Sequence, residues 1–220
     1  MTSEPHIVLV HGLWHQGAHM EPLAQVLRSR GATVHTPTLH RGSLASDTGA
    51  VQAIVDASPA PPIVLGHSYG GAVITGLTGI RTLVYLAAFV PTTGESCASL
   101  GGALVNDVMQ RHPAGGTVID PELAGAALYA DAQPQTAAWA IGLLLPQASG
   151  HGRGIPEREA WQSTRSRYIV CTQDRAVDPE VQRMLAQRCS TMVELDADHS
   201  PYISQPDVIA GIVLAELSFS

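Results

Sequence analysis

The sequence predicts an α/β protein with a mostly parallel sheet, helices on both faces of the sheet and a small helical insertion. Short apolar runs alternate with helix-type patterns, both before residue 91 and after residue 165. Strands that are apolar without interruption are buried on both faces, which is typical of parallel sheets. Residues 92–164 break this rhythm with paired glycines and helix-like stretches. We therefore expect a core of residues 1–91 and 165–220 with an inserted helical lid over 92–164.

Apolar and β-branched runs place the strands of the first half, and helix-type spacing places the helices between them. The expected strands are residues 6–10, 33–36, 62–65 and 81–89. A helix is expected from about residue 18 to residue 30, where Gly31 closes it as a C-terminal cap. Asp47 is expected to cap a second helix, which ends before the prolines of residues 59–62.

The insertion contains two stretches, residues 121–131 and 134–145, that are apolar on nearly every side. Such helices are usually buried or line a cleft, so we expect a lid; additional helical packing is the alternative, and both can hold together. After the insertion, strands are expected at 168–171 and 191–195, with a helix near 178–188 between them. The final helix, from about residue 204, is expected to pack Val208, Ile209, Ile212 and Val213.

Composition excludes several classes of protein. The net charge of −7 argues against a nucleic-acid surface. No apolar run approaches the roughly 20 residues of a membrane span, and no basic segment precedes a signal-type stretch at the N-terminus, so we expect neither kind of segment. The three cysteines are odd in number and lack metal-ligand spacing, so we expect reduced thiols in a cytoplasmic protein. All twelve basic residues are arginine, which excludes a lysine Schiff base.

The pentapeptide Gly-His-Ser-Tyr-Gly at residues 66–70 predicts a nucleophile, Ser68. A buried strand that ends in Gly-x-Ser-x-Gly and opens a helix is typical of a strained turn that lifts the serine hydroxyl clear of the sheet. Glycine at 66 and 70 removes side chains that would collide, and Gly71 lets the helix approach the sheet. A plain turn before a helix is the alternative, but the apolar flanks on both sides favour the nucleophile.

A serine hydroxyl is a poor nucleophile at neutral pH, so Ser68 needs a base, and the base needs an acid that orients it. With this kind of turn the chain order is serine, acid, histidine, each at the carboxyl end of a strand. Asp174 follows the expected strand 168–171, and His199 follows the expected strand 191–195. These positions predict Asp174 as the acid and His199 as the base.

Three other aspartates compete for the role of the acid. Asp178 precedes a proline at an expected helix start, where aspartate serves as a cap. Asp196 and Asp198 share a loop with His199 and would struggle to reach its far nitrogen. Position alone therefore favours Asp174.

An oxyanion hole needs two backbone amides. One is expected from Tyr69, directly after the nucleophile, and the other from Leu13, in the loop behind the first strand. The same loop carries His11, His15 and His19, whose spacing of four suggests a metal site. Glycines interrupt the helix that this spacing needs, and no Glu follows in the His-Glu-x-x-His manner, so we expect no metal.

With these motifs in place, the chain resembles a compact bacterial member of the α/β-hydrolase fold, in the group related to plant methylesterases and hydroxynitrile lyases. The resembling segments cover nearly the whole chain: Val-Leu-Val-His-Gly at 8–12, Leu-Gly-His-Ser-Tyr-Gly-Gly at 65–71, residues 137–147, Tyr-Ile-Val-Cys-Thr-Gln-Asp at 168–174 and Asp-His-Ser-Pro-Tyr-Ile-Ser-Gln-Pro at 198–206. The resemblance implies a triad of Ser68, Asp174 and His199. It also implies hydrolysis of small carboxylic esters without a cofactor.

One departure from the family pattern separates the activities that the resemblance allows. The hydroxynitrile lyases of this group carry a lysine directly after the catalytic histidine, and here that residue is Ser200. Lyase chemistry is therefore disfavoured, and a serine esterase acting on a small-molecule substrate is the leading hypothesis. A biosynthetic cyclase or decarboxylase that uses the same triad for proton transfer, and a non-catalytic ligand receptor, remain as alternatives.

Overall fold

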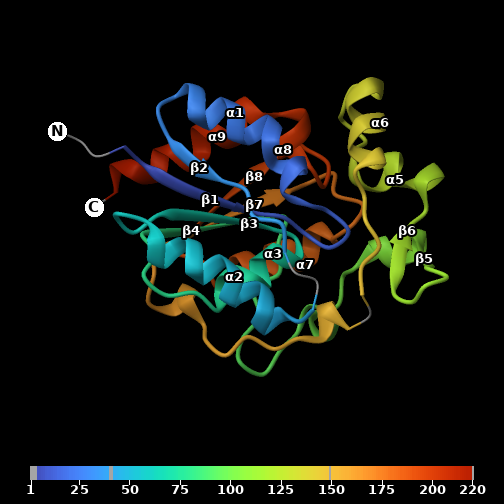
Figure 1. Cartoon of the computed structure of the whole chain (residues 1–220), viewed down its shortest axis with the longest axis horizontal. Helices are drawn as coiled ribbons and strands as arrows, with labels where there is room; N and C mark the ends of the chain where they lie inside the picture. Colours follow the sequence, from blue (N-terminus) through green and yellow to red (C-terminus); the bar gives the residue numbers. More distant parts are fainter. Residues whose placement is uncertain (1–3, 40–41, 149, 220) are drawn as a thin grey trace.

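Six parallel strands form the central sheet of the computed structural model, which describes residues 4–39, 42–148 and 150–219 (Figure 1). Their spatial order is β2-β1-β3-β4-β7-β8. The strands are β1 (His6–Val10), β2 (Thr33–His35), β3 (Ile63–His67), β4 (Thr82–Leu86), β7 (Ser166–Cys171) and β8 (Thr191–Leu195). Every residue of β3 and β4 is buried, as expected for uninterrupted apolar strands in the middle of a parallel sheet.

Helices cover both faces of this sheet (Figure 1). One face carries α1 (Glu21–Ser29), α8 (Pro201–Ser204) and α9 (Pro206–Ala215). The other face carries α2 (Leu44–Ala57), α3 (Tyr69–Thr75) and α7 (Pro179–Ala186). Two hydrophobic clusters lie between these layers and the sheet, because side chains alternate between the two faces of each strand. The predicted fold class is confirmed.

Two local predictions about helices are wrong. Helix α2 begins at Leu44, and its cap is Ser43, whose side chain accepts a hydrogen bond from the amide of Ser46. Asp47 lies inside the helix and is fully buried, where it accepts a hydrogen bond from another helix. In α9, Val208 is 44% exposed, because the buried stripe follows Ile209 and Val213 instead.

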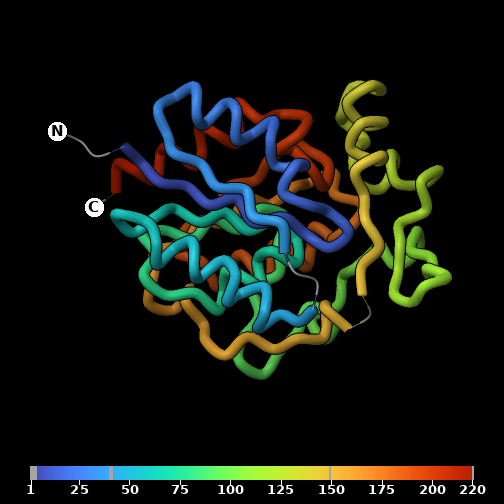
Figure 2. Tube along the Cα trace, in the orientation of Figure 1, coloured from blue at the N-terminus to red at the C-terminus, as the bar shows by residue number. Residues whose placement is uncertain are grey.

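Residues 92–164 lie outside the six-stranded sheet. They form α4 (Cys97–Leu100), β5 (Met109–Arg111), β6 (Thr117–Ile119), α5 (Pro121–Leu128) and α6 (Pro134–Gly142). Short 3₁₀ turns lie at Leu104–Val108, His151–Arg153 and Ala160–Gln162 here, and at Gly17–Met20 and Glu216–Ser218 in the core. The Cα trace shows α5, α6 and the β5–β6 hairpin standing to one side of the sheet, away from both chain ends (Figure 2). The antiparallel β5–β6 hairpin was not predicted.

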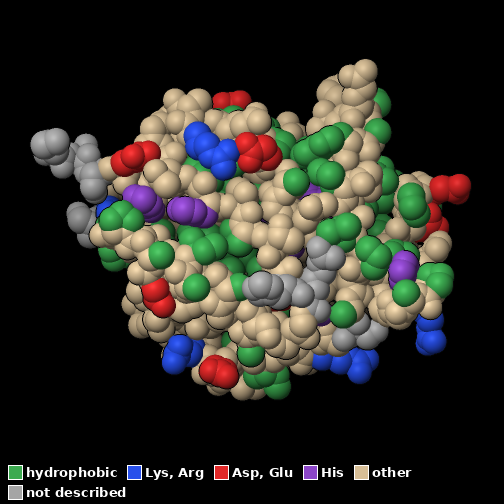
Figure 3. Space-filling model, in the orientation of Figure 1, with side chains coloured by type: hydrophobic (Ala, Val, Ile, Leu, Met, Phe, Trp, Pro, Cys, Tyr) green, Lys and Arg blue, Asp and Glu red, His purple; other side chains and the backbone are tan. Residues whose placement is uncertain are grey.

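Helices α5 and α6 of the insertion are less buried than their composition suggests. Leu123 is 46% exposed and Trp139 is 41% exposed, and Ala140 is the buried residue of α6. Hydrophobic side chains are accordingly visible on the surface of this part of the molecule (Figure 3). Among the described residues, none of the helices has the length and apolarity needed to cross a bilayer.

Candidate active site

Ser68 lies at the turn between β3 and α3 in a backbone conformation that L-residues rarely adopt, with φ 55° and ψ −122°. The glycines at 66 and 70 are required because a side chain at either position would collide with nearby atoms. A Cβ on Gly66 would lie 2.6 Å from the carbonyl oxygen of Gly70, and a Cβ on Gly70 would lie 2.5 Å from the carbonyl oxygen of Val10. The glycines thus avoid collisions with backbone atoms rather than with other side chains. Ser68 is half-buried, so its hydroxyl can meet a ligand.

Asp174 follows β7 and His199 follows β8, and the structure brings their side chains together. Nδ1 of His199 lies 2.8 Å from Oδ2 of Asp174. Because a carboxylate only accepts hydrogen bonds, Nδ1 carries the proton and Nε2 is left as an acceptor. Both side chains are nearly inaccessible to solvent, with Asp174 4% and His199 2% exposed. A buried carboxylate needs hydrogen-bond donors, and the Nδ1–H of His199 supplies one to Asp174.

The three competing aspartates have other contacts. Asp178 caps α7 by accepting a hydrogen bond from the amide of Glu180. Asp196 accepts a hydrogen bond from the Thr172 hydroxyl. Asp198 accepts from the amide of Ser200 in its own loop and from the amide of Asp131 in the insertion, and burial raises the pKa of its carboxyl above the ordinary value.

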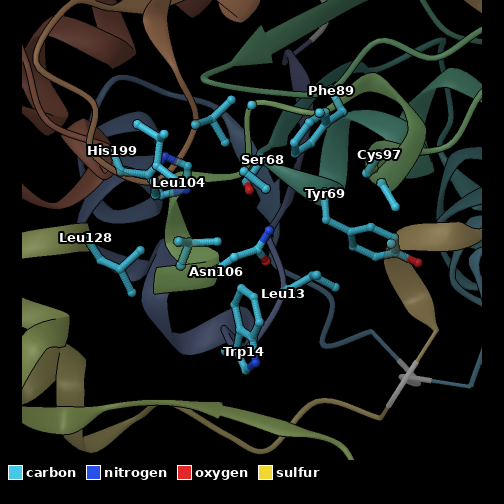
Figure 4. Close-up of a pocket in the computed structure, with 18 of the residues that line it drawn as sticks. Leu13, Trp14, Ser68, Tyr69, Phe89, Cys97, Leu104, Asn106, Leu128 and His199 are labelled. Atoms are coloured by element: carbon cyan, nitrogen blue, oxygen red, sulfur yellow. The ribbon is translucent and has the colours of Figure 1, made fainter. Parts of the chain in front are cut away.

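Leu13 and Tyr69 line the same pocket as Ser68 and His199 (Figure 4). Tyr69 is the first residue of α3, where the N–H has no acceptor inside the helix. The Leu13 N–H donates to none of the described residues. These two backbone amides are thus the candidates for stabilising a negatively charged oxygen that forms at Ser68.

The pocket has a volume of about 380 Å³ and lies between the carboxyl ends of the strands and the insertion. Core residues line one side, and residues of the 92–164 segment, including Asn106 and Leu128, line the other. Its other apolar lining residues include Leu13, Trp14, Phe89, Leu104 and Val177. Figure 4 shows Asn106 among these side chains, with Trp14 and Leu13 nearby. The pocket thus offers a mostly apolar surface in front of Ser68.

Comparison with known proteins identifies the family. Residues 7–212 match the Alpha/beta hydrolase family. The chain belongs to this family. A carbendazim hydrolyzing esterase of Nocardioides sp. (strain SG-4G) is 40% identical in an alignment of 111 positions that covers 42% of this chain and 46% of that protein. The match therefore spans about half the length of that relative.

Solved structures share the whole fold. A pyrethroid hydrolase of Sphingobium faniae JZ-2 superposes with a TM-score of 0.86 at 22% identity, covering 98% of each chain. A methylesterase of Arabidopsis superposes with a TM-score of 0.82 at 21% identity, covering 98% of this chain and 100% of that chain. The expected relation to plant methylesterases is confirmed at the level of the fold.

Buried histidines surround the site of this α/β-hydrolase. Nδ1 of His15 donates to the carbonyl of Leu13 at 2.7 Å, and Nε2 of His67 donates to the carbonyl of His199 at 2.9 Å. Burial, reinforced by neighbouring histidines, holds the pKa values of His15 and His67 well below the ordinary value. Both rings therefore stay neutral while they hold the two loops of the site.

The described residues contain no group of three histidine, cysteine or acidic side chains placed to hold a metal. His11, His15 and His19 do not converge on one point; each ring forms a hydrogen bond with a backbone group instead. Nε2 of His11 accepts from the amide of Leu39, and Nε2 of His19 donates to the carbonyl of Ala140. These rings serve packing and hydrogen bonding.

Two residues of the hydrolase site were not predicted. The side-chain amide of Gln182 donates to Oδ2 of Asp174 at 2.7 Å, although Gln182 lies on α7 and is fully buried. The hydroxyl of Tyr129, in the insertion, lies 2.9 Å from Nε2 of His15. The available signal for Gln182 was its spacing: it lies three and four positions before Leu185 and Ala186, on the buried side of α7. Nothing local in the sequence indicates the Tyr129 contact.

Proposed function

We propose that this protein is a serine hydrolase that cleaves small carboxylic esters through an acyl-enzyme on Ser68. The observation that carries the proposal is the Asp174–His199 hydrogen bond of 2.8 Å at the pocket that Ser68 borders. This arrangement leaves Nε2 of His199 free to accept the serine proton. The esterase and hydrolase relatives support the same class of reaction.

In the first half of the reaction, His199 takes the Ser68 proton as Oγ attacks the ester carbonyl. The amides of Leu13 and Tyr69 donate to the oxyanion that forms. The tetrahedral intermediate then collapses: the bond to the alkoxy group breaks, His199 gives its proton to the departing oxygen, and an alcohol leaves. Asp174 stabilises the imidazolium in both steps and remains ionised.

In the second half, water replaces the alcohol. His199 takes a proton from the water as its oxygen attacks the acyl carbon, and the same two amides bind the new oxyanion. When this intermediate collapses, the bond to Ser68 Oγ breaks and Oγ regains the proton. The products are a carboxylic acid and the free enzyme, so no cofactor is needed.

The pocket favours esters with apolar groups of moderate size. A volume of about 380 Å³ lies at the small end of ligand pockets. Leu104, Leu128 and Val105 border it from the insertion, so we assign the insertion the role of a lid that selects the substrate. The Asn106 carboxamide provides a polar group for an oxygen of the substrate.

Hydrolysis of p-nitrophenyl butyrate tests this proposal. The wild-type protein should release p-nitrophenol, and Ser68→Ala should lower the rate by about 10⁵-fold or more, the effect seen when a triad acts as a unit. Ser29→Ala, which alters an exposed serine of α1, is the matched control and should leave the rate unchanged. A wild-type protein without hydrolysis, or a Ser68→Ala variant that retains it, overturns the proposal.

A further inference from the structure

The turn between α5 and α6, residues 129–131, contacts both loops of the site. On one side, the amide of Asp131 donates to Oδ2 of Asp198 at 2.9 Å, and the amide of Asp198 donates to Oδ2 of Asp131 at 2.7 Å. Two aspartates 67 positions apart in the chain thus form a reciprocal pair of hydrogen bonds. This pair joins the insertion to the loop that carries His199.

Asp198 continues the link past the histidine. Its Oδ1 accepts from the amide of Ser200 at 2.9 Å. The residue before His199 is therefore hydrogen-bonded to the residue after it. Asp198 is only 2% exposed, whereas Asp131 lies at the surface. Burying a carboxylate next to another carboxylate is costly, and here it is offset by N–H donors. The position of the His199 backbone therefore depends on a contact with the insertion.

On its other side the same turn reaches the loop of the oxyanion amide. The Tyr129 hydroxyl donates to Nε2 of His15, and Nδ1 of His15 donates to the carbonyl of Leu13. Tyr129 is buried, with 1% of its surface exposed. The adjacent Trp14 has a positive φ of 61°, a conformation that persists only where surrounding contacts hold it. The amide of Leu145, also in the insertion, donates a hydrogen bond to the carbonyl of Trp14.

We infer that the turn 129–131 is a positioning element that fixes the catalytic histidine, through Asp131 and Asp198, and the oxyanion amide, through Tyr129 and His15. The inference rests on the proposed function, since it assigns the turn a role in that reaction. The Leu13 amide and His199 belong to loops that follow different strands, β1 and β8. A single turn that contacts both loops sets their separation, and small misplacements at a reacting centre reduce turnover strongly.

Asp131→Ala tests the link to His199 because Asp131 is exposed and does not line the pocket. With p-nitrophenyl butyrate, kcat should fall about tenfold, while KM stays within about twofold, because geometry rather than binding is disturbed. Asp131→Asn keeps an acceptor oxygen and should recover most of the loss. The matched control is Asp120→Ala, which removes an acidic cap of α5 whose hydrogen bonds stay within the insertion. Its kcat should match wild type.

Tyr129→Phe tests the second arm. It removes the hydroxyl that donates to His15 and keeps the ring, so packing is retained. We expect kcat to fall by about tenfold through the oxyanion loop. The fall should persist in the Asp131→Ala background, because the two arms act on different loops.

A background without the histidine separates positioning from general stability. Asp131→Ala should cause no further loss in His199→Ala, since its effect passes through His199. An unchanged kcat in Asp131→Ala, an equal fall in Asp120→Ala, or a further loss in the His199→Ala background overturns the inference. The proposed function is judged separately, by whether wild type hydrolyses the ester and Ser68→Ala does not.

Discussion

At the scale of single residues, the Asp174 carboxylate has every acceptor direction occupied. Oδ1 accepts from the amides of Ala176 and Val177, and Oδ2 accepts from Gln182 and His199. Such a carboxylate cannot rotate without breaking several bonds, so it fixes the imidazole ring and its tautomer. Asp178 is four residues away and is engaged as a helix cap.

Exchanging each of these aspartates for asparagine distinguishes their roles. Asp174→Asn should lower kcat by about 10⁴-fold, because the amide favours the wrong tautomer of His199. Asp178→Asn should change kcat little, since asparagine also caps helices well. Steady-state kinetics on both variants checks this. If Asp178→Asn caused the larger loss, the acid would have to be reassigned.

Gly12 provides a second prediction at this scale. A Cβ on Gly12 would lie 2.9 Å from the Cβ of Ser68, so Gly12→Ala should displace the nucleophile and lower kcat by about 100-fold. Gly49→Ala is the matched control, because no atom of the described residues outside its own helix and chain neighbours lies within 4 Å of the added methyl group. That variant should keep full activity and a slightly raised melting temperature. Equal activity of both variants would contradict this reading of the turn.

The sequence could place the candidate residues because strand ends are local features. Strands β3, β7 and β8 end at residues 67, 171 and 195 in the structure, and the expected Ser68, Asp174 and His199 follow them. Asp47 could not be placed in the same way. As a polar residue near a helix start it resembles a cap, but its partner, the Tyr69 hydroxyl, comes from another helix 22 positions later.

At the scale of elements, the β5–β6 hairpin shows where local patterns fail. Its strands have three residues each, Met-Gln-Arg in β5 and Thr-Val-Ile in β6, and all three residues of β5 are exposed. Neither strand shows the alternation of apolar and polar residues that predicts a strand. The turn between them depends on Gly115 and Gly116, both with positive φ. Thr117 then pairs with Gln147, far along the chain. Pairing of this kind depends on tertiary contacts.

The start of the insertion is joined to the core by an ion pair. Two nitrogens of Arg188, which follows the C-terminus of α7, contact the carboxylate of Glu95, with Nη2 3.0 Å from Oε1. The hydrogen bond to Arg188 lowers the pKa of Glu95 to about 2. Because the folded-state pKa is depressed, the pair stabilises the protein above the unfolded value near 4.3 and loses this effect as pH falls towards 2.

Glu95→Gln should therefore lower the free energy of unfolding by about 1 kcal/mol at pH 6, since the pair is partly solvated. The gap between variant and wild type should narrow below pH 4. Urea unfolding at pH 6 and pH 3.5 measures both values. A gap that stays constant across this range would show that the pair contributes nothing through charge.

At the scale of the whole molecule, three buried histidines tie stability to pH. Burial lowers the pKa values of His15, His19 and His67 in the folded protein. The unfolded chain takes up protons near pH 6.5, whereas the folded protein takes them up only at lower pH. Below about 6.5 the unfolded state therefore binds more protons, and stability falls as pH falls.

The free energy of unfolding should thus decrease from pH 7 to pH 5, by up to about 1.4 kcal/mol per pH unit for each histidine. His19→Gln should make this dependence shallower, while His35→Gln, at an exposed position of β2, should leave it unchanged. Urea midpoints at several pH values between 5 and 7 provide the measurement. A flat profile in wild type would mean that the buried rings accept protons without cost.

The proposed reaction depends on one covalent bond, between Ser68 Oγ and the acyl group. Mass spectrometry after treatment with a fluorophosphonate, followed by peptide mapping, tests for the activated serine directly. We predict a single adduct on Ser68, absent in Ser68→Ala and formed far more slowly in Asp174→Asn. An adduct on another residue, or no adduct on a folded wild-type protein, would contradict the serine mechanism.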